Sequence, residues 1–106
     1  MKIINTKVIG DLYATEDILL TGIVQGNIHI LAGGNLALDG KCNGIIIVKT
    51  GGIARISGNV SGYVFNMGGE LYIDASASIS DGAYHIFGMT QGNVNYISDE
   101  NLSNHS

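Results

Sequence analysis

The residues that could do chemistry are few and widely spaced in this chain. Its 106 residues include one cysteine, Cys42, and three histidines, His29, His85 and His105. No cysteine and histidine stand at the spacing of zinc ligands, and a single cysteine cannot form an internal disulfide. The pattern therefore predicts no catalytic residue, no metal site and no cofactor, and it predicts that the protein is not an enzyme.

The most reactive residue types also have simple structural interpretations. Cys42 alternates with Val24 and Val60 in a column of apolar positions, which indicates a buried thiol acting as a small hydrophobe. We expect His29 to be an isolated surface histidine, because it falls on the outward side of an alternating run. The carboxylates of Glu16–Asp17 are expected at a solvated turn and not as an acid–base pair.

A repeat of 18 residues determines where these side chains lie. Three copies align, DILLTGIVQG, NLALDGKCNG and IARISGNVSG, and a weaker copy, ELYIDASASI, follows after a step of 17. Glycines coincide in the aligned copies: Gly22, Gly40 and Gly58, and again Gly26, Gly44 and Gly62. A short, fixed period is typical of one supersecondary unit stacked on itself.

Each copy contains three short runs in which apolar and polar residues alternate, and this is the signal of β-strands. Three strands turned by glycine close one coil, so we expect an all-β fold, a single-domain parallel β-helix of about five coils of about 18 residues. The glycines would lie at corners, where a positive φ or a tight bend excludes a Cβ. The predicted domain spans residues 1–97, and residues 98–106 are expected to form a flexible tail.

The alternation assigns each side chain to the inside or the outside of the coils. The residues predicted to point inward are Leu12, Ala14, Ile18, Leu20, Val24, Ile28, Ile30, Leu36, Leu38, Cys42, Ile46, Val48, Ala54, Ile56, Val60, Val64, Leu71 and Ile73. Asn66 also falls at an inward position, which indicates either a side-chain ladder or a slip of register. From Ala83 the repeat decays, and the segment AYHIFGMTQGNVNYIS is expected to form one irregular closing coil.

The outward residues of the first face differ from those of the other two faces, which are polar. Five of them form a predicted partner-binding patch: Tyr13, Ile45, Ile47, Tyr63 and Phe65. A contiguous apolar patch on a small domain is normally an interface. Two alternatives stay open: either the C-terminal segment folds back over the patch, or the register is wrong and these residues are core. The covering side chains would be Tyr84, Phe87, Met89 and Tyr96.

Composition limits the partners and the location. Five basic residues against nine acidic ones give a net charge of −4, which disfavours nucleic acid and anionic membranes and permits a basic protein partner. No apolar run approaches the roughly 18 to 20 residues of a membrane span. The first residues lack the features of a secretory signal, and a single cysteine suits a reducing compartment, so we expect a cytoplasmic protein.

The aligned copies resemble a known family over about residues 8 to 82. The units GIVQGNI, GKCNGII and GNVSGYV, and the closing run GGELYIDASASISDG, are similar to the core of the bactofilins, polymer-forming bacterial cytoskeletal proteins. Stretches such as KTGGIARISG and NMGGELYID are also similar to autotransporter passenger repeats. The bactofilin resemblance implies a right-handed β-helix that polymerises end to end without a nucleotide.

Three functions are compatible with these observations. The first is a structural protein that self-assembles, because an open solenoid end exposes unpaired backbone groups. The second is a small acidic binding module, such as an immunity protein that neutralises a basic toxin. The third is an acyltransferase, because an 18-residue coil equals three hexapeptides, although no loop with a catalytic histidine interrupts the coils.

Overall fold

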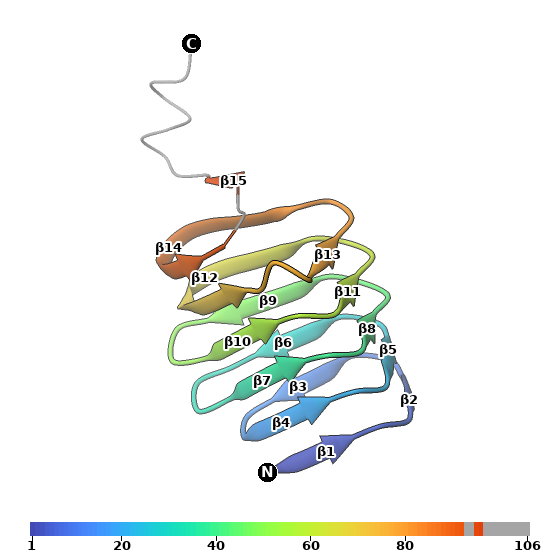
Figure 1. Ribbon diagram of the computed structural model, residues 1–106. Helices are drawn as coiled ribbons and strands as arrows, with labels where there is room; N and C mark the ends of the chain where they lie inside the picture. The colour runs from blue at the N-terminus through green and yellow to red at the C-terminus, as the bar shows by residue number, and fades with distance from the viewer. Residues whose placement is uncertain (93–94, 97–106) are drawn as a thin grey trace.

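The chain folds into short parallel strands stacked in coils, as Figure 1 shows. This computed structural model describes residues 1–92 and 95–96. The strands are β1 (Lys2–Ile4), β2 (Lys7–Ile9), β3 (Leu12–Ala14), β4 (Asp17–Leu20), β5 (Ile23–Gln25), β6 (Ile28–Ile30), β7 (Asn35–Leu38), β8 (Lys41–Cys42), β9 (Ile46–Lys49), β10 (Ile53–Ile56), β11 (Asn59–Val60), β12 (Val64–Ile73), β13 (Ser78–Ile79), β14 (Ala83–Gln91) and β15 (Asn95–Tyr96). All strand pairs within the described residues are parallel. The predicted all-β solenoid of about five coils is confirmed.

Three faces surround the interior of the solenoid. Face 1 contains β3, β6, β9, the first parts of β12 and β14, and β15. Face 2 contains β1, β4, β7, β10 and the later parts of β12 and β14. Face 3 contains β2, β5, β8, β11 and β13. Because β12 continues around a corner, faces 1 and 2 belong to one sheet, whereas face 3 is separate.

The coil length is close to 18 residues in the middle and departs from it at both ends. The offset between paired residues is 16 from β1 to β4, 18 from β4 to β7 and from β7 to β10, and 17 from β10 to β12. The last offset is much shorter, since Tyr84 pairs with Asn95. The chain between them is too short for a full coil of the kind seen earlier.

Apolar side chains fill the interior at the predicted positions. All the residues predicted to point inward are buried except Leu12 and Ile73, which are half-buried against the core. The core also includes residues that the repeat did not indicate: Ile4, Val8, Ala77, Ile79 and Ala83. Full burial of one such aliphatic side chain stabilises the fold by about 1.5–3 kcal/mol, so the stacked columns hold the coils together.

The repeat glycines are required by close approach between coils and not by a positive φ. A Cβ on Gly40 would lie 2.0 Å from the carbonyl oxygen of Gly22, and one on Gly58 would lie 2.1 Å from that of Gly40. Positive φ values occur at a different corner, 84° at Gly33 and 86° at Gly51. Of the two predicted reasons for the aligned glycines, the tight bend is therefore correct.

Asn66 is fully buried and stabilises a bulge in β12. Its Nδ2 donates to the carbonyl oxygens of Gly69 and Met89, at 3.2 and 3.0 Å, and to Oγ1 of Thr90 at 2.8 Å. Its Oδ1 accepts the N–H of Gly69 at 2.8 Å. The pairing of β12 shifts register directly after this residue, so the predicted slip is correct and the ladder is not.

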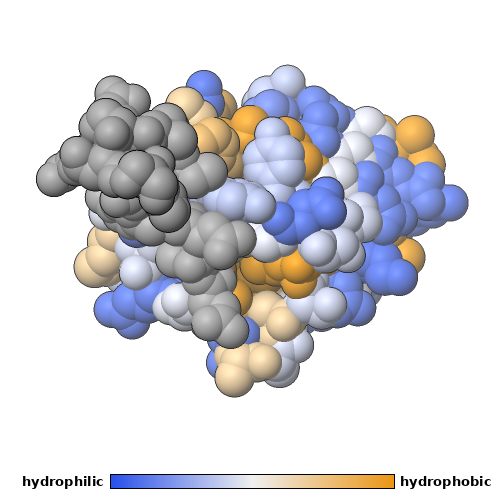
Figure 2. All heavy atoms as spheres, turned by 90° about the horizontal axis from the view of Figure 1, so that it is seen from above, coloured by the Kyte–Doolittle hydropathy of each residue, from blue (hydrophilic) through white to orange (hydrophobic). Residues whose placement is uncertain are grey.

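From Ala83 to Gln91 the chain is irregular, as expected, and its interior is more polar than that of the other coils, while residues 93–94 and 97–98 of the predicted closing coil lie outside the described residues. His85 pairs with Asn66, and Thr90 pairs with Leu71, so both continue inward columns. Viewed from above in Figure 2, hydrophobic side chains appear among hydrophilic ones at this end of the stack. The predicted flexible tail, residues 98–106, lies outside the described residues.

Candidate association surfaces

Face 1 carries a continuous row of aromatic and aliphatic side chains, which we call the face-1 stripe. It consists of outward residues on successive strands: Tyr13, His29, Ile45, Ile47, Tyr63, Phe65 and Tyr84. Strand pairing places one of these residues from each coil in a single column that runs along the solenoid axis. Ile45 and Tyr63 lie one strand position before Ile46 and Val64, which pair, and so form a second column beside the first.

The rings of the stripe contact one another in two groups, one near each end of the stripe. Tyr13 stacks on His29 with a centroid separation of 4.7 Å and an interplanar angle of 9°. Tyr63 makes edge contacts with Phe65 at 6.2 Å and with Tyr84 at 6.3 Å. Such ring contacts stabilise the fold by about 0.5–1.5 kcal/mol each beyond simple burial. They also hold the rings in place, and rings that are already ordered would lose less entropy in an interface.

All five residues of the predicted patch lie together on face 1, and two further members were not predicted. Tyr13 is 59% exposed, and the other four predicted residues are half-buried. His29 was expected to be isolated, and this is wrong, because it lies between Tyr13 and Ile47 in the column. Tyr84 was expected only as a covering residue. Its place in the column follows once the 19-residue offset between β12 and the start of β14 is known.

Beside the stripe, hydrogen bonds between Asp11 and the residues Asn27 and His29 connect the first coil to the second. Asp11 Oδ1 accepts the N–H of Asn27 at 3.0 Å, and its Oδ2 lies 3.2 Å from Nε2 of His29. The hydrogen bond from Asn27, and then that from His29, hold the pKa of Asp11 below its usual value. Asp11 is therefore directed at the second coil and away from the N-terminal end of the stack.

The C-terminal segment extends the stripe and does not cover it. Tyr84 lies beside Phe65 in the next coil, while Phe87 and Met89 are 55% and 42% exposed. The alternative in which this segment folds back over face 1 is wrong through the end of β14, and the side chain of Tyr96 lies outside the described residues. The alternative of a misassigned register is also wrong, because none of the stripe residues belongs to the buried core.

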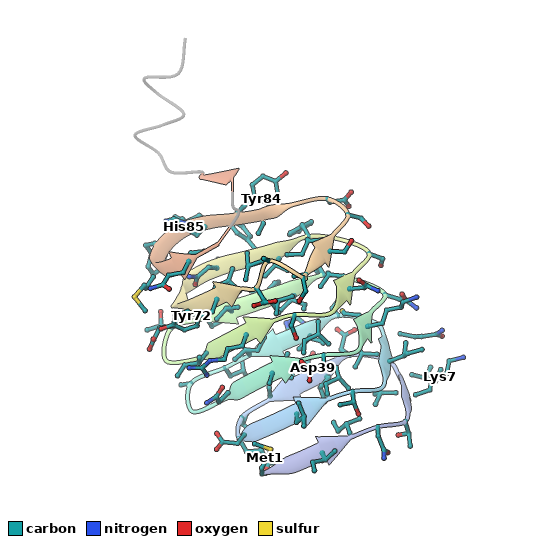
Figure 3. The ribbon with its side chains drawn as sticks, in the orientation of Figure 1. Met1, Lys7, Asp39, Tyr72, Tyr84 and His85 are labelled. Atoms are coloured by element: carbon teal, nitrogen blue, oxygen red, sulfur yellow. The ribbon has the colours of Figure 1, made fainter. Side chains whose placement is uncertain are left out.

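The second candidate surface is the N-terminal end of the stack, which we call the open end. It consists of β1, β2 and β3, each the last strand of its face, so one side of each backbone has no strand beside it within the described chain. The inward residues here, Ile4, Val8 and Leu12, are only half-buried. The outward residues Ile3 and Ile9 are 62% and 74% exposed. Met1 and Lys7 lie at this end in Figure 3.

Cys42 has the buried position that its column predicted. It pairs with Val24 and Val60 on face 3 and belongs to the core. Its thiol donates to the carbonyl oxygen of Gly26 at 3.5 Å. Desolvation raises the pKa of Cys42 to about 11, so the thiol is protonated and unreactive at neutral pH.

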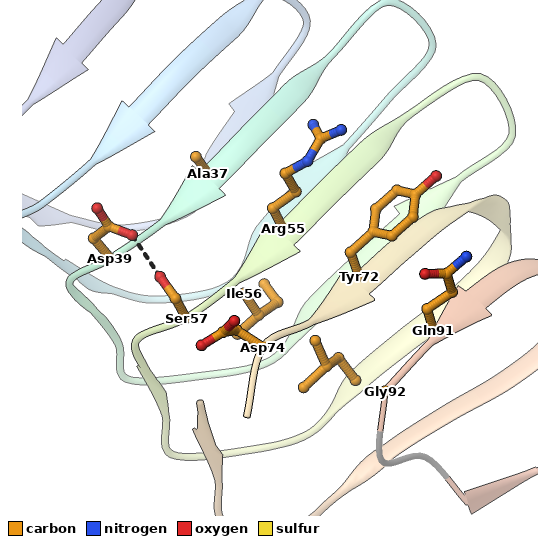
Figure 4. A pocket seen from close by; sticks show the side chains of 10 residues that line it. Ala37, Asp39, Arg55, Ile56, Ser57, Tyr72, Asp74, Gln91 and Gly92 are labelled. Atoms are coloured by element: carbon orange, nitrogen blue, oxygen red, sulfur yellow. Dashed lines mark hydrogen bonds between the residues drawn. The ribbon is translucent and has the colours of Figure 1, made fainter. Parts of the chain in front are cut away.

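A groove of about 520 Å³ crosses face 2 and reaches the corner toward face 3 (Figure 4). Its lining includes Ala37, Asp39, Arg55, Ile56, Ser57, Tyr72, Ile73, Asp74, Gln91 and Gly92. The Arg55 guanidinium lies 5.1 Å from the centre of the Tyr72 ring, and Ser57 Oγ donates to Asp39. These polar groups are therefore already engaged with one another.

Two ionisable groups that line the groove, Asp74 and Tyr72, have pKa values displaced away from neutrality. The hydroxyl and the backbone N–H of Ser76 donate to Asp74 and hold its pKa below the usual value. The hydrogen bond to Glu70 raises the pKa of Tyr72. A general acid or base works best with a pKa near the operating pH, so these two groups are poorly suited to proton transfer at pH 7.

The described chain lacks two other kinds of site. Within residues 1–92 and 95–96, no three His, Cys, Asp or Glu side chains lie close enough together to hold a metal ion. The same part of the chain contains no helix long and apolar enough to cross a membrane.

Comparisons with protein-family models, with curated proteins and with solved structures found no match to this chain. The resemblance to the bactofilins is therefore still a prediction, carried by the repeat units alone. What the structure identifies is the fold: the chain is a parallel β-solenoid of about five coils.

Proposed function

We propose that this protein is a non-catalytic structural solenoid that associates with further copies of itself in the cytoplasm, as its resemblance to the bactofilins implies. The observation that carries the proposal is the open end. Three strands there lack a neighbour on one side within the described chain. An unpaired strand edge is a template for another strand.

The interior columns give a second argument for association at the open end. Val8 pairs with Val24, which is fully buried, and Leu12 pairs with Ile28, which is also fully buried. The terminal members of these columns are half-buried, and the described chain places no coil beyond them. A stacked copy would complete their burial, and this contributes up to about 1–2 kcal/mol for each aliphatic side chain.

Lys2 moderates this tendency. It pairs with Ile18 and so occupies an inward column, yet its own side chain is exposed. Charged residues at a strand edge weaken edge-to-edge pairing, although a lysine stem can carry its ammonium group to the rim of a contact. We therefore expect a reversible association that depends on concentration.

The proposal is tested by sedimentation velocity and electron microscopy across a range of protein concentrations. Wild type should form species larger than the monomer, without nucleotide, and Leu12→Glu should return the protein to monomers. Ile3→Glu combined with Ile9→Glu is a second variant that should also return the protein to monomers. It should fold normally, because both side chains are already exposed. Gln25→Glu is the matched control, one coil away in the column of Ile9, and it should assemble like wild type. A wild type that stays monomeric at the highest concentration would overturn the proposal.

The face-1 stripe favours a second candidate, a binding module that occludes a basic partner such as a toxin. Its ordered rings would supply anchors, and carboxylates such as Asp11, Asp17 and Asp39 would steer a basic protein toward it. The test is titration with the protein encoded by the neighbouring gene. Tyr63→Ala and Phe65→Ala should each cost about 2 kcal/mol of binding free energy. Equal binding by both variants and by wild type would exclude face 1.

A further inference from the structure

The groove on face 2 is separate from both the open end and the face-1 stripe. Its walls belong mainly to β7, β10 and the later part of β12, which lie between the first coil and the coil of β14. Its volume of about 520 Å³ falls within the range of about 300–1,000 Å³ that is typical of small-molecule sites. The chemistry of its walls therefore indicates what it can bind.

Two rows of outward side chains form the walls of the groove (Figure 4). The first row contains residues that pair across successive coils: Ala37, Arg55, Tyr72 and Gln91. The second row contains the residues that directly follow the last paired residues of β7, β10 and β12: Asp39, Ser57 and Asp74. The rows are two residues, or about 7 Å, apart along each strand. Because Ile56 and Ile73 also line the groove, polar walls flank an apolar floor.

The second row presents hydrogen-bond acceptors that are held in place. Asp39 Oδ1 accepts the hydroxyl of Ser57, and Asp74 Oδ2 accepts the hydroxyl and the backbone N–H of Ser76. The other oxygen of each carboxylate accepts no side-chain hydrogen bond within the described residues. The bonds from Ser76 also lower the pKa of Asp74, which is therefore ionised at neutral pH and only accepts. The two carboxylates lie two coils, or about 10 Å, apart.

The first row presents donors and an aromatic ring. The guanidinium of Arg55 carries five N–H donors, of which one nitrogen, Nη1, donates to Asn35 at 3.5 Å. The same group lies 5.1 Å from the centre of the half-buried Tyr72 ring, which orients it. Gln91 is exposed and adds an amide that both donates and accepts. A ligand in the groove thus meets acceptors on one side, donors on the other and carbon atoms below.

We propose that this groove binds a neutral oligosaccharide, a binding activity separate from the proposed self-association. A sugar hydroxyl both donates and accepts, so it can bond to a carboxylate on one wall and to Arg55 on the other. The C–H groups of a sugar ring pack on the apolar floor and on Tyr72. Asp39 and Asp74 repel an anionic ligand, and Arg55 opposes a cation between the walls. Since one pyranose ring cannot reach both carboxylates, the ligand contains at least two sugar units.

Titration with maltohexaose, cellohexaose and xylohexaose, followed by nuclear magnetic resonance, tests the proposal. At least one sugar should shift amide signals in β7, β10 and the later part of β12 and leave those of face 1 unchanged. Asp39→Asn and Asp74→Asn should each weaken binding about three- to tenfold, because an amide oxygen accepts less strongly than a carboxylate. Both should fold like wild type, since asparagine still accepts the serine hydroxyl. Asp81→Asn, an exposed residue outside the groove, is the matched control.

Tyrosine variants test the contact with the sugar ring. Tyr72→Ala should weaken binding about tenfold or more, because the aromatic surface is lost. Tyr72→Phe keeps the ring and removes only the hydroxyl, so it should bind like wild type. Tyr13→Ala, which removes an exposed ring on face 1, is the matched control and should also bind like wild type. Equal binding by Tyr72→Ala and wild type would overturn the assignment of the sugar to this groove.

A basic peptide is the competing ligand, and hexalysine is the probe for it. Sugar binding should be the same at low and high salt, whereas binding of hexalysine would weaken as salt screens its charges. Binding of hexalysine but of none of the three sugars would overturn the proposal, and so would the absence of any shift. The monomeric variant Leu12→Glu should bind sugar like wild type. Loss of self-association and loss of sugar binding are therefore distinguishable.

Discussion

The middle coils and the terminal coils of this solenoid are both built from short parallel strands. They differ in the polarity and burial of the residues in their inward columns. In the middle, the column formed by Ile18, Leu36 and Ala54 is apolar and almost fully buried. At the first coil the same column begins with the exposed Lys2, and at the last it ends with Thr90. The middle is a closed core, whereas the ends combine incomplete burial with charge.

This difference shows where stability and association are located. A change in the middle should unfold the protein, because neighbouring coils on both sides depend on it. A change at the open end should leave most of the fold intact and affect contacts with other molecules. Paired substitutions in the two regions can therefore separate the two properties, and the largest difference is expected in the core.

Truncation of a core leucine should cost much more in the middle than at the open end. Leu38 is fully buried, whereas Leu12 is half-buried. We expect Leu38→Ala to lower the free energy of unfolding by about 3 kcal/mol, from lost burial and a residual cavity. Leu12→Ala should cost about 1 kcal/mol, because water already reaches this side chain. Urea unfolding followed by circular dichroism measures both, and equal losses would contradict the comparison.

A methyl group added to a middle corner should cost more than one added at the first corner. The new Cβ of Gly40→Ala would collide with the carbonyl oxygen of Gly22, so the backbone must move, at a cost of about 2–3 kcal/mol. Gly10 has open space around it, and Gly10→Ala meets only the strain of a φ of 104°, about 1–2 kcal/mol. Thermal unfolding of the two variants should rank them in this order. The reverse ranking would show that coil contact is not the reason for the aligned glycines.

Removal of the buried Asn66 amide should destabilise the protein mainly where the regular coils meet the irregular coil that contains β14. Asn66→Ala leaves the N–H of Gly69 and an acceptor at Met89 without their side-chain partner, which costs about 2 kcal/mol. Asn43→Ala, on an exposed residue of the same type, should change stability by less than about 0.5 kcal/mol. Hydrogen exchange should quicken in β14 more than in β9 in the first variant. Uniform exchange across both strands would contradict a local role for Asn66.

The smallest effect concerns the attachment of the first coil as a function of pH. The pKa of Asp11 is lowered in the folded protein, so its contribution to stability is complete above the unfolded value, near pH 4, and is lost as pH falls through the folded value. Hydrogen exchange in β3, corrected for the intrinsic rate, should therefore quicken below about pH 4. Asp11→Asn should remove this dependence, and a β3 that responds like the middle strands would argue against an attachment through Asp11.

The repeat predicted most of the fold because each column is a physical constraint that recurs in the sequence. An 18-residue period with glycine at fixed positions requires coils in register, and the inward residues follow from alternation. The first coil was harder to recognise, since its offset is 16 residues and the outward neighbours of Ile4 and Val8, Ile3 and Ile9, are apolar too, so the alternation is lost. The bulge at Asn66 was visible only as a polar residue at an apolar position.

The surfaces were predicted less completely than the core. The five residues of the patch were identified because they interrupt a polar outward pattern. His29 was misjudged because its neighbours in the column come from other coils, and its contacts with Asp11 and Tyr13 span 16 to 18 residues of sequence. An open end was expected for the solenoid in general, but β1 and β2, which form much of it, were not identified because they precede the part of the sequence in which the repeat is recognisable.

The central claim is that the open end associates with another copy, and hydrogen exchange at increasing protein concentration tests it most directly. We predict that backbone amides in β1, β2 and β3 exchange more slowly as concentration rises, while those in β5 to β9 do not change. Exchange in β1 to β3 that is independent of concentration, in a protein that sediments as a monomer throughout, would contradict this claim.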